Sequence, residues 1–294
     1  MAERKRKWGD RKDGYLVKEN DPLHAIAPYM LPNRADNEAF LTETIDMTNL
    51  VAYIDRKNAD NPEFKYTFFH FIVAALAKTI VLRPKMNRFY SGHRLYDRKD
   101  LLFSFVVKKA FADNAEEVLA TIKVDPESDV PAMEQVYEKV KKIVYSVRKR
   151  NETDSTTDKM NLLLVLPRPI LRLAVRFLRW LEYHGWYPKS LMCDDPYYSS
   201  VFLSNLGSIK MSADYHHLAN WGTNSIFVIV GEKKPTPFYR EDGSVYVHDA
   251  LKLSLTIDER IADGFYFANS IKILRKLFEN PELIEQPITQ PIDL

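Results

Sequence analysis

The feature that most restricts the fold of this chain is a strand pattern that runs directly into an acidic motif and then into a helix. In "LKLSLTID", residues 251–258, apolar and polar side chains alternate with the period of a half-buried β-strand. The motif "ERIADG" follows, and after Gly264 the residues "FYFANSIKILRKLF" repeat apolar side chains at helical spacing. The motif therefore lies where the chain leaves a sheet for a helix, a place where a rigid scaffold presents side chains for binding or catalysis.

Composition narrows the kind of protein that carries this motif. The chain has 294 residues, 46% of them hydrophobic, so it can bury a large core, and its formal net charge is only +2. This small charge gives no reason to expect nucleic acid or an acidic membrane surface as a partner. The most apolar segments are interrupted by charged residues or prolines, so we expect no membrane span.

The N-terminal segment and the cysteine content indicate a reducing compartment. The basic segment 1–20 lacks the apolar run of a secretory signal, and we interpret it as a solvated or partner-packing extension rather than a nucleic-acid-binding arm. Cys193 is the single cysteine, which excludes an internal disulfide framework. We therefore expect a cytoplasmic protein, and we expect no metal because no metal-ligand spacing surrounds the cysteine.

Helix and strand patterns alternate along the rest of the chain. Residues 40–57 predict a strand followed by a helix, and residues 87–109 predict two strands joined by a Ser91-Gly92 turn. Further elements are predicted as helices in 65–84 and 131–150, and as strands in 199–208, 223–234 and 242–258.

One helix, predicted within residues 166–191 and ended by Gly185 and Pro188, carries an unusual basic stripe. Leucine and valine side chains share one face, while three arginines occupy another: Leu171, Val175, Leu178 and Leu181 against Arg172, Arg176 and Arg179. A helix of this kind binds anions or a membrane surface. It also occurs packed on its own domain, with the arginine stems lying along apolar surface, and we favour this second interpretation.

Several short motifs together resemble one protein family. "LSLTIDERIADG", followed by a helix and "LFENPEL", is similar to the C-terminal end of the acyltransferase component of 2-oxo acid dehydrogenase complexes, whose motif is H-x-x-x-D-G. "VFLSNLGS" resembles this family's strand with a serine-containing turn, and "KYTFFHFIVAALAKTI" and "HRLYDRKDLLFSFVVKK" match its N-terminal half in order. The resemblance covers roughly residues 21–284. It implies an α/β fold, a two-layer α+β sandwich with the chloramphenicol acetyltransferase-like mixed sheet flanked by helices.

The resemblance also implies three site residues. The family's motif histidine is a general base that removes the proton of the acyl acceptor, and its position here is Glu259. The turn serine, which donates a hydrogen bond to the tetrahedral oxyanion, corresponds to Ser204. The motif aspartate, which holds the active-site loop, corresponds to Asp263. We expect its carboxylate to be buried and paired with backbone amides or an arginine, for which Arg34 and Arg260 are candidates.

A glutamate at the position of the histidine changes the chemistry. The ordinary pKa values of the two side-chain types are about 4.3 and 6.5, so the carboxylate is the weaker base unless an apolar pocket raises its pKa. A carboxylate also repels a nearby oxyanion. His216 and His217 are alternative bases, although tandem loop histidines more commonly lie at the surface or serve packing. They belong to "MSADYHHLANWG", which replaces the loop that normally follows the serine.

The expected organisation is one catalytic domain, residues 21–285, with a helical insertion at about 161–190 and a tail at 286–294. We expect no lipoyl domain or peripheral-subunit-binding segment before it. The resemblance implies a homotrimer whose active sites lie between subunits, with Ser204 of one chain facing Glu259 of the next.

We therefore expect a stand-alone acyltransferase that takes an acyl group from a coenzyme A thioester. The acceptor is an unidentified thiol, hydroxyl or amine, and this chain carries no lipoyl group. The alternative is a catalytically inactive relative that acts as a ligand-binding or scaffolding trimer. A core subunit of a dehydrogenase complex is the least favoured hypothesis, because a lipoyl arm would have to deliver the acyl group.

Overall fold

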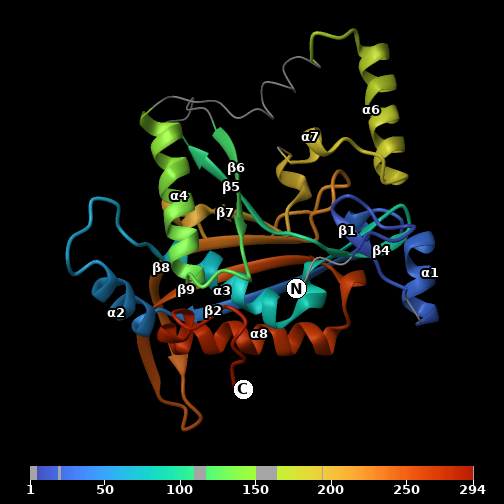
Figure 1. Ribbon diagram of the computed structural model, residues 1–294. Helices are drawn as coiled ribbons and strands as arrows, with labels where there is room; N and C mark the ends of the chain where they lie inside the picture. The colour runs from blue at the N-terminus through green and yellow to red at the C-terminus, as the bar shows by residue number, and fades with distance from the viewer. Residues whose placement is uncertain (1–4, 19–20, 109–116, 150–163, 194, 294) are drawn as a thin grey trace.

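The computed structural model describes residues 5–18, 21–108, 117–149, 164–193 and 195–293, and its main feature is a six-stranded mixed sheet (Figure 1). The strand order is β2-β9-β8-β7-β5-β6. The neighbours β8/β7 and β7/β5 are parallel, and the other neighbours are antiparallel. The strands are β2 (Glu38–Asp46), β5 (Leu101–Lys108), β6 (Glu117–Val124), β7 (Val201–Asn205), β8 (Ile226–Tyr239) and β9 (Val245–Asp258).

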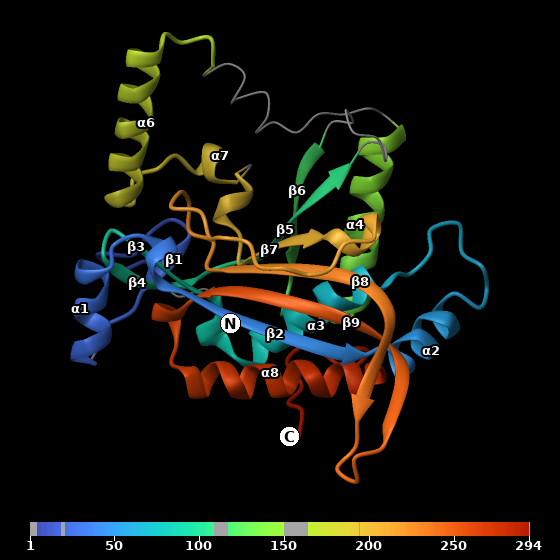
Figure 2. The same cartoon turned by 180° about the vertical axis from the view of Figure 1, so that it is seen from behind.

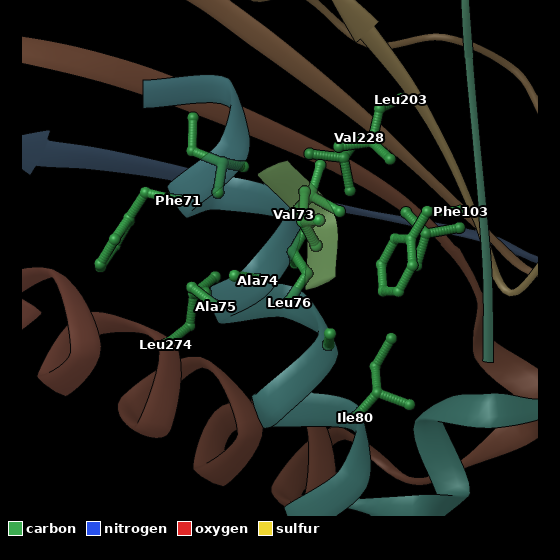
Figure 3. Close-up of a cluster of buried hydrophobic side chains, with 14 of the residues drawn as sticks. Phe71, Val73, Ala74, Ala75, Leu76, Ile80, Phe103, Leu203, Val228 and Leu274 are labelled. Carbon is green, nitrogen blue, oxygen red and sulfur yellow. The ribbon is translucent and has the colours of Figure 1, made fainter. Parts of the chain in front are cut away.

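Helices cover one face of this sheet and form the core with it. They are α2 (Thr48–Lys57), α3 (Phe68–Leu82), α4 (Ala132–Lys149) and α8 (Gly264–Glu279). Figure 3 shows α3 between the sheet and α8, with Val73 directed toward Val228 and Ala75 beside Leu274. The alternation expected in β9 is confirmed, because Leu251 to Ile257 at every second position are buried in this core. A mixed sheet flanked by helices confirms the expected fold class.

A second, smaller sheet corrects the sequence prediction for residues 87–109. That segment forms three strands rather than two: β3 (Arg88–Ser91), β4 (Arg94–Arg98) and β5. β3 and β4 form a hairpin that pairs with β1 (Gly14–Leu16) in the order β1-β4-β3, whereas β5 joins the large sheet. The turn between β3 and β4 has positive φ at Gly92 and His93, as a two-residue hairpin loop requires.

The two ends of the chain also differ from the expected extension and tail. Because β1 pairs with β4 and the buried Arg11 guanidinium donates to Asp13 and Ser91, residues 10–16 are part of the folded body. At the other end, Lys78 of α3 donates to the carbonyl oxygens of Leu283 and Pro287. The expected boundaries at residues 20 and 285 therefore do not separate loose ends from the domain.

The expected insertion contains α6 (Arg168–Tyr183) and α7 (Lys189–Met192); its first residues, 161–163, lie outside the described ones. α6 ends where expected, with Gly185 at φ 71°. α6 has no buried residue, so the favoured interpretation of a helix packed on its own domain holds only in part. Figures 1 and 2 show α6 standing away from the six-stranded sheet. Among the described residues, no helix is long and apolar enough to cross a membrane.

The buried His70 in α3 gives a testable pH dependence. Its Nδ1 accepts the backbone N–H of Thr67 at 3.0 Å, and burial lowers its pKa to about 4. In the unfolded chain the His70 imidazole takes up a proton near pH 6.5, whereas in the folded chain it does so only near pH 4. The contribution of the neutral, buried His70 to stability is therefore complete above pH 6.5 and is lost as the pH falls from 6.5 toward 4. Glutamine keeps an acceptor for the Thr67 N–H but does not titrate. Between pH 7 and pH 4 we therefore expect His70→Gln to lose less stability than wild type, by up to about 3 kcal/mol.

Urea unfolding of wild type and His70→Gln at several pH values measures this difference. Parallel stability–pH curves for the two proteins would contradict the assignment, because the remaining carboxylates titrate in both.

Candidate active site

The acidic motif lies at the end of β9, where a buried carboxylate joins three segments of the chain. Asp258 is fully buried, and its two oxygens accept hydrogen bonds from Arg260 at 2.8 and 2.7 Å. Arg34 lies on the same carboxylate with Nε 3.7 Å away, and it also donates to the carbonyl oxygens of Ala219 and Gly222. This network fixes the backbone that presents the next residue, Glu259.

Glu259 begins the short 3₁₀ helix η5 (Glu259–Ile261), and its side chain is exposed. Among the described residues it has no hydrogen-bond or ion-pair partner. Its neighbours Asp258 and Arg260 are buried, so the motif holds one free carboxylate on a rigid support. A carboxylate in this state can accept a proton or a hydrogen bond from a ligand or from a second chain.

Asp263 does not have the expected environment in this chain. It is exposed rather than buried, and it caps α8 by accepting the N–H of Tyr266 at 2.8 Å, which lowers its pKa. The backbone-amide pairing is present, but the two candidate arginines, Arg34 and Arg260, hold Asp258 instead. Sequence reasoning missed Asp258, whose signal was an aspartate on the polar side of an alternating strand, two residues before an arginine.

The cap interpretation leads to a prediction about α8. Asp263→Ala should lower the melting temperature by about 2 °C, because it leaves the N–H of Tyr266 without its acceptor. Asp263→Asn should melt close to wild type, since asparagine is as good an N-cap as aspartate. Thermal unfolding by circular dichroism distinguishes the two. A large drop in the melting temperature of Asp263→Asn would show that the negative charge itself is needed, as in a buried ion pair.

Ser204 lies near the end of β7 on the sheet face opposite the helices. Strand alternation places it on the same side as Phe202, which packs with Phe227 and Ile229 in a second apolar cluster. Ser204 is half-buried, and among the described residues its hydroxyl has no hydrogen-bond partner. The hydroxyl is therefore free to donate to a ligand.

Within one chain, Ser204 and Glu259 lie far apart along the sheet. Ser204 is level with Ile229 of β8, which is level with Ser254 of β9. Glu259 follows five residues later, about 17 Å away along the strand at roughly 3.4 Å per residue. A single chain therefore does not bring the two residues together.

The loop at residues 211–222 crosses the same sheet face. Its Leu218 N–H donates to Glu38 at the start of β2, and the ring of His216 stacks on Phe227 with centroids 4.3 Å apart. His216 and His217 are both exposed, and the Nδ1 of His216 lies 3.0 Å from the carbonyl oxygen of His217. His216 therefore shares the face of Ser204.

A cavity of about 190 Å³ lies behind the Asp258 network, between η1 (Arg34–Asn37), the β3–β4 turn and the C-terminal end of α6. Arg34, Arg260 and Glu182 line it. Burial raises the pKa of Glu182, whose carboxylate accepts the Ser91 hydroxyl at 3.1 Å. The described residues contain no group of three or more side chains suited to hold a metal ion.

Comparison with solved structures defines the class of fold. At TM-scores of 0.53 to 0.56 the chain superposes on three solved structures. A chloramphenicol acetyltransferase is 10% identical, with 90% of this chain and 99% of that chain covered. A probable dihydrolipoamide acetyltransferase from Listeria monocytogenes 4b F2365 is 15% identical, with 89% and 94% covered. A truncated catalytic core of the 2-oxoacid dehydrogenase multienzyme complex from Thermoplasma acidophilum is 18% identical, with 91% and 99% covered. The fold is that of chloramphenicol acetyltransferase.

Sequence comparison adds a similarity to one protein family. Residues 189–285 match the family described as 2-oxoacid dehydrogenases acyltransferase (catalytic domain). The lipoamide acyltransferase component of the branched-chain alpha-keto acid dehydrogenase complex of Bacillus subtilis (strain 168) is 21% identical over 263 residues. The match covers 87% of this chain but only 50% of that relative, so the chain spans about half its length. The resemblance inferred from the motifs is confirmed, and the matched segment contains both Ser204 and Glu259.

Proposed function

We propose that this chain is a stand-alone, coenzyme A-dependent acyltransferase whose active site forms between subunits of a homotrimer. The observation that carries the proposal is the separation of Ser204 and Glu259, two polar side chains without a partner among the described residues, which one chain holds about 17 Å apart along the sheet. Their roles require a common substrate, so the chemistry needs a second copy of the chain. We keep the cytoplasm as the proposed location.

The proposed reaction follows from these two groups. A thiol, hydroxyl or amine acceptor loses its proton to the Glu259 carboxylate and attacks the thioester carbonyl carbon. The oxyanion of the tetrahedral intermediate accepts a hydrogen bond from the Ser204 hydroxyl. When the intermediate collapses, the carbon–sulfur bond breaks and the coenzyme A thiolate takes the proton back from Glu259.

A subunit-complementation experiment tests this arrangement. Ser204→Ala alone should lower acyl transfer from acetyl-coenzyme A about a hundredfold, because an oxyanion donor is lost. Ser204→Ala and Glu259→Gln chains should each be nearly inactive but partly restore one another when refolded together. In randomly mixed trimers about one interface in four combines an intact Ser204 with an intact Glu259, so about a quarter of wild-type activity should return.

The controls for this experiment are each variant refolded alone and the two variants mixed without refolding. No recovery after the two variants are refolded together, with trimers present by light scattering, would contradict a site shared between two subunits. A monomeric wild type would contradict the proposal directly.

The inactive alternative is favoured by one observation, the exposed carboxylate at the position of the family's base. In that case the trimer binds coenzyme A or another ligand without turning it over. Calorimetric titration with coenzyme A, together with turnover assays on thiol, alcohol and amine acceptors and no lipoyl carrier present, separates binding from catalysis.

A further inference from the structure

The outer surface of α6 carries an apolar stripe that the described residues of the chain do not cover. Four large side chains at spacings of three and four residues are each 48–69% exposed: Ile170, Leu173, Phe177 and Trp180. The stripe continues past the helix end, because Trp180 packs edge-on against the exposed Trp186 with centroids 5.3 Å apart. Exposed apolar residues scattered singly need no explanation, but a contiguous patch of this kind marks an interaction surface.

The polar face of α6 is entirely basic. Arg168, Arg172, Arg176 and Arg179 lie along it, and none of the four has an ion-pair partner among the described residues. Arg168, Arg172 and Arg176 face outward, whereas Arg179 also lines the cavity beside the body. The helix has one acidic residue, Glu182, and it is directed into the body, where it accepts the hydroxyl of Ser91. The outward surface of α6 therefore combines an apolar stripe with a row of free positive charges.

The attachment of α6 leaves this surface available. Its third face is half-buried, and Leu178 on it packs with the cluster of Tyr187, Met192 and Tyr198. The C-terminal end is held by Arg11, which donates to the carbonyl oxygen of Glu182 at 2.8 Å. Figure 2 shows the rest of the helix extending away from the body. The fold thus anchors α6 at its C-terminal end without covering its stripe.

We propose that α6 lies in the surface of an anionic lipid bilayer. A helix with one basic face and an apolar face containing phenylalanine and tryptophan lies flat at the level of the lipid headgroups. The arginines reach up to the phosphates while their stems lie along the acyl chains, and the tryptophans occupy the boundary. At 16 residues, about 24 Å, α6 is too short to cross the membrane.

Charge distinguishes this partner from a second copy of the chain. A subunit contact would also cover the stripe, but a chain of net charge +2 provides no excess of acid for four arginines. An anionic bilayer supplies phosphate or carboxylate oxygens for all of them at once. The charge pattern therefore favours the lipid surface.

Vesicle flotation of the full-length chain tests the proposal. We expect binding to phosphatidylcholine vesicles that contain one-third phosphatidylglycerol, weaker binding in high salt, and little binding to phosphatidylcholine alone. The double variant Arg172→Gln/Arg176→Gln should bind about 25-fold more weakly, roughly fivefold per arginine. Lys65→Gln/Lys272→Gln, which removes two exposed charges far from α6, is the matched control and should bind like wild type.

A second pair of variants tests the apolar stripe. Phe177→Asp should abolish vesicle binding, whereas Val247→Asp, at the similarly exposed position on the β8–β9 hairpin, should not. Circular dichroism and light scattering on the same samples report folding and assembly. If wild type fails to float, or binds neutral and anionic vesicles equally, the proposal is wrong. If Phe177→Asp instead breaks an oligomer, the stripe is a subunit contact and the proposal is equally overturned.

Discussion

We expect Glu259→Gln to lower the kcat/KM of acyl transfer about 10²–10⁴-fold, the range that a positioned general base contributes. The glutamine has nearly the same shape, and the wild-type carboxylate has no partner among the described residues, so folding and assembly should not change. Steady-state turnover of acetyl-coenzyme A with a thiol acceptor measures the effect. Glu279→Gln, at an exposed position at the end of α8, is the control and should retain full activity.

The substitution Glu259→His sharpens this test. It rebuilds the base that the family motif carries, on the same η5 backbone held by the Asp258 network. We expect it to retain or increase transfer to a simple thiol. If Glu259→Gln turns over as fast as wild type, another residue is the base. His216→Gln and His217→Gln would then be the variants to assay. No turnover in any of these proteins, with coenzyme A bound, would support the inactive alternative.

The second large effect concerns stability. Asp258→Asn should lower the free energy of unfolding by about 3–5 kcal/mol, because it leaves two buried guanidinium groups without their counter-charge. Arg34 and Arg260 are only 6% and 5% exposed. Burial lowers the pKa of Arg34, and the Asp258 carboxylate opposes that shift. Without the carboxylate, the charged guanidinium is disfavoured in the folded protein and not in the unfolded chain.

Asp249→Asn is the matched control for this prediction. Asp249 lies on the same strand, β9, and pairs with Lys233 at 2.6 Å, but its side chain is 44% exposed. Exposed ion pairs contribute at most about 1 kcal/mol, so this variant should unfold close to wild type. Urea unfolding monitored by tryptophan fluorescence gives both values. Equal, small losses in the two variants would mean that solvent reaches the Asp258 network.

The local elements of this fold are determined by short stretches of sequence. The period of β9 and the apolar run of α3 are visible without any tertiary information, because each pattern reflects one element packing against one core. The resemblance to the acyltransferase family then predicted the mixed sheet and the candidate site residues Ser204 and Glu259. Ser204 lies in the patterned strand β7 and Glu259 directly follows the patterned strand β9, which is why the sequence could propose both as candidates.

The tertiary structure decided which charged groups are buried, because burial depends on segments that are far apart in the sequence. Asp258 and Asp263 lie five residues apart, yet only Asp258 meets Arg34, which arrives from η1 more than 200 positions earlier. The same holds for β1 and β4, whose pairing joins residues 14–16 to residues 96–98. In α6 the sequence specified an amphipathic helix, but only the structure showed that its apolar stripe remains uncovered, since periodicity fixes a face and not its partner.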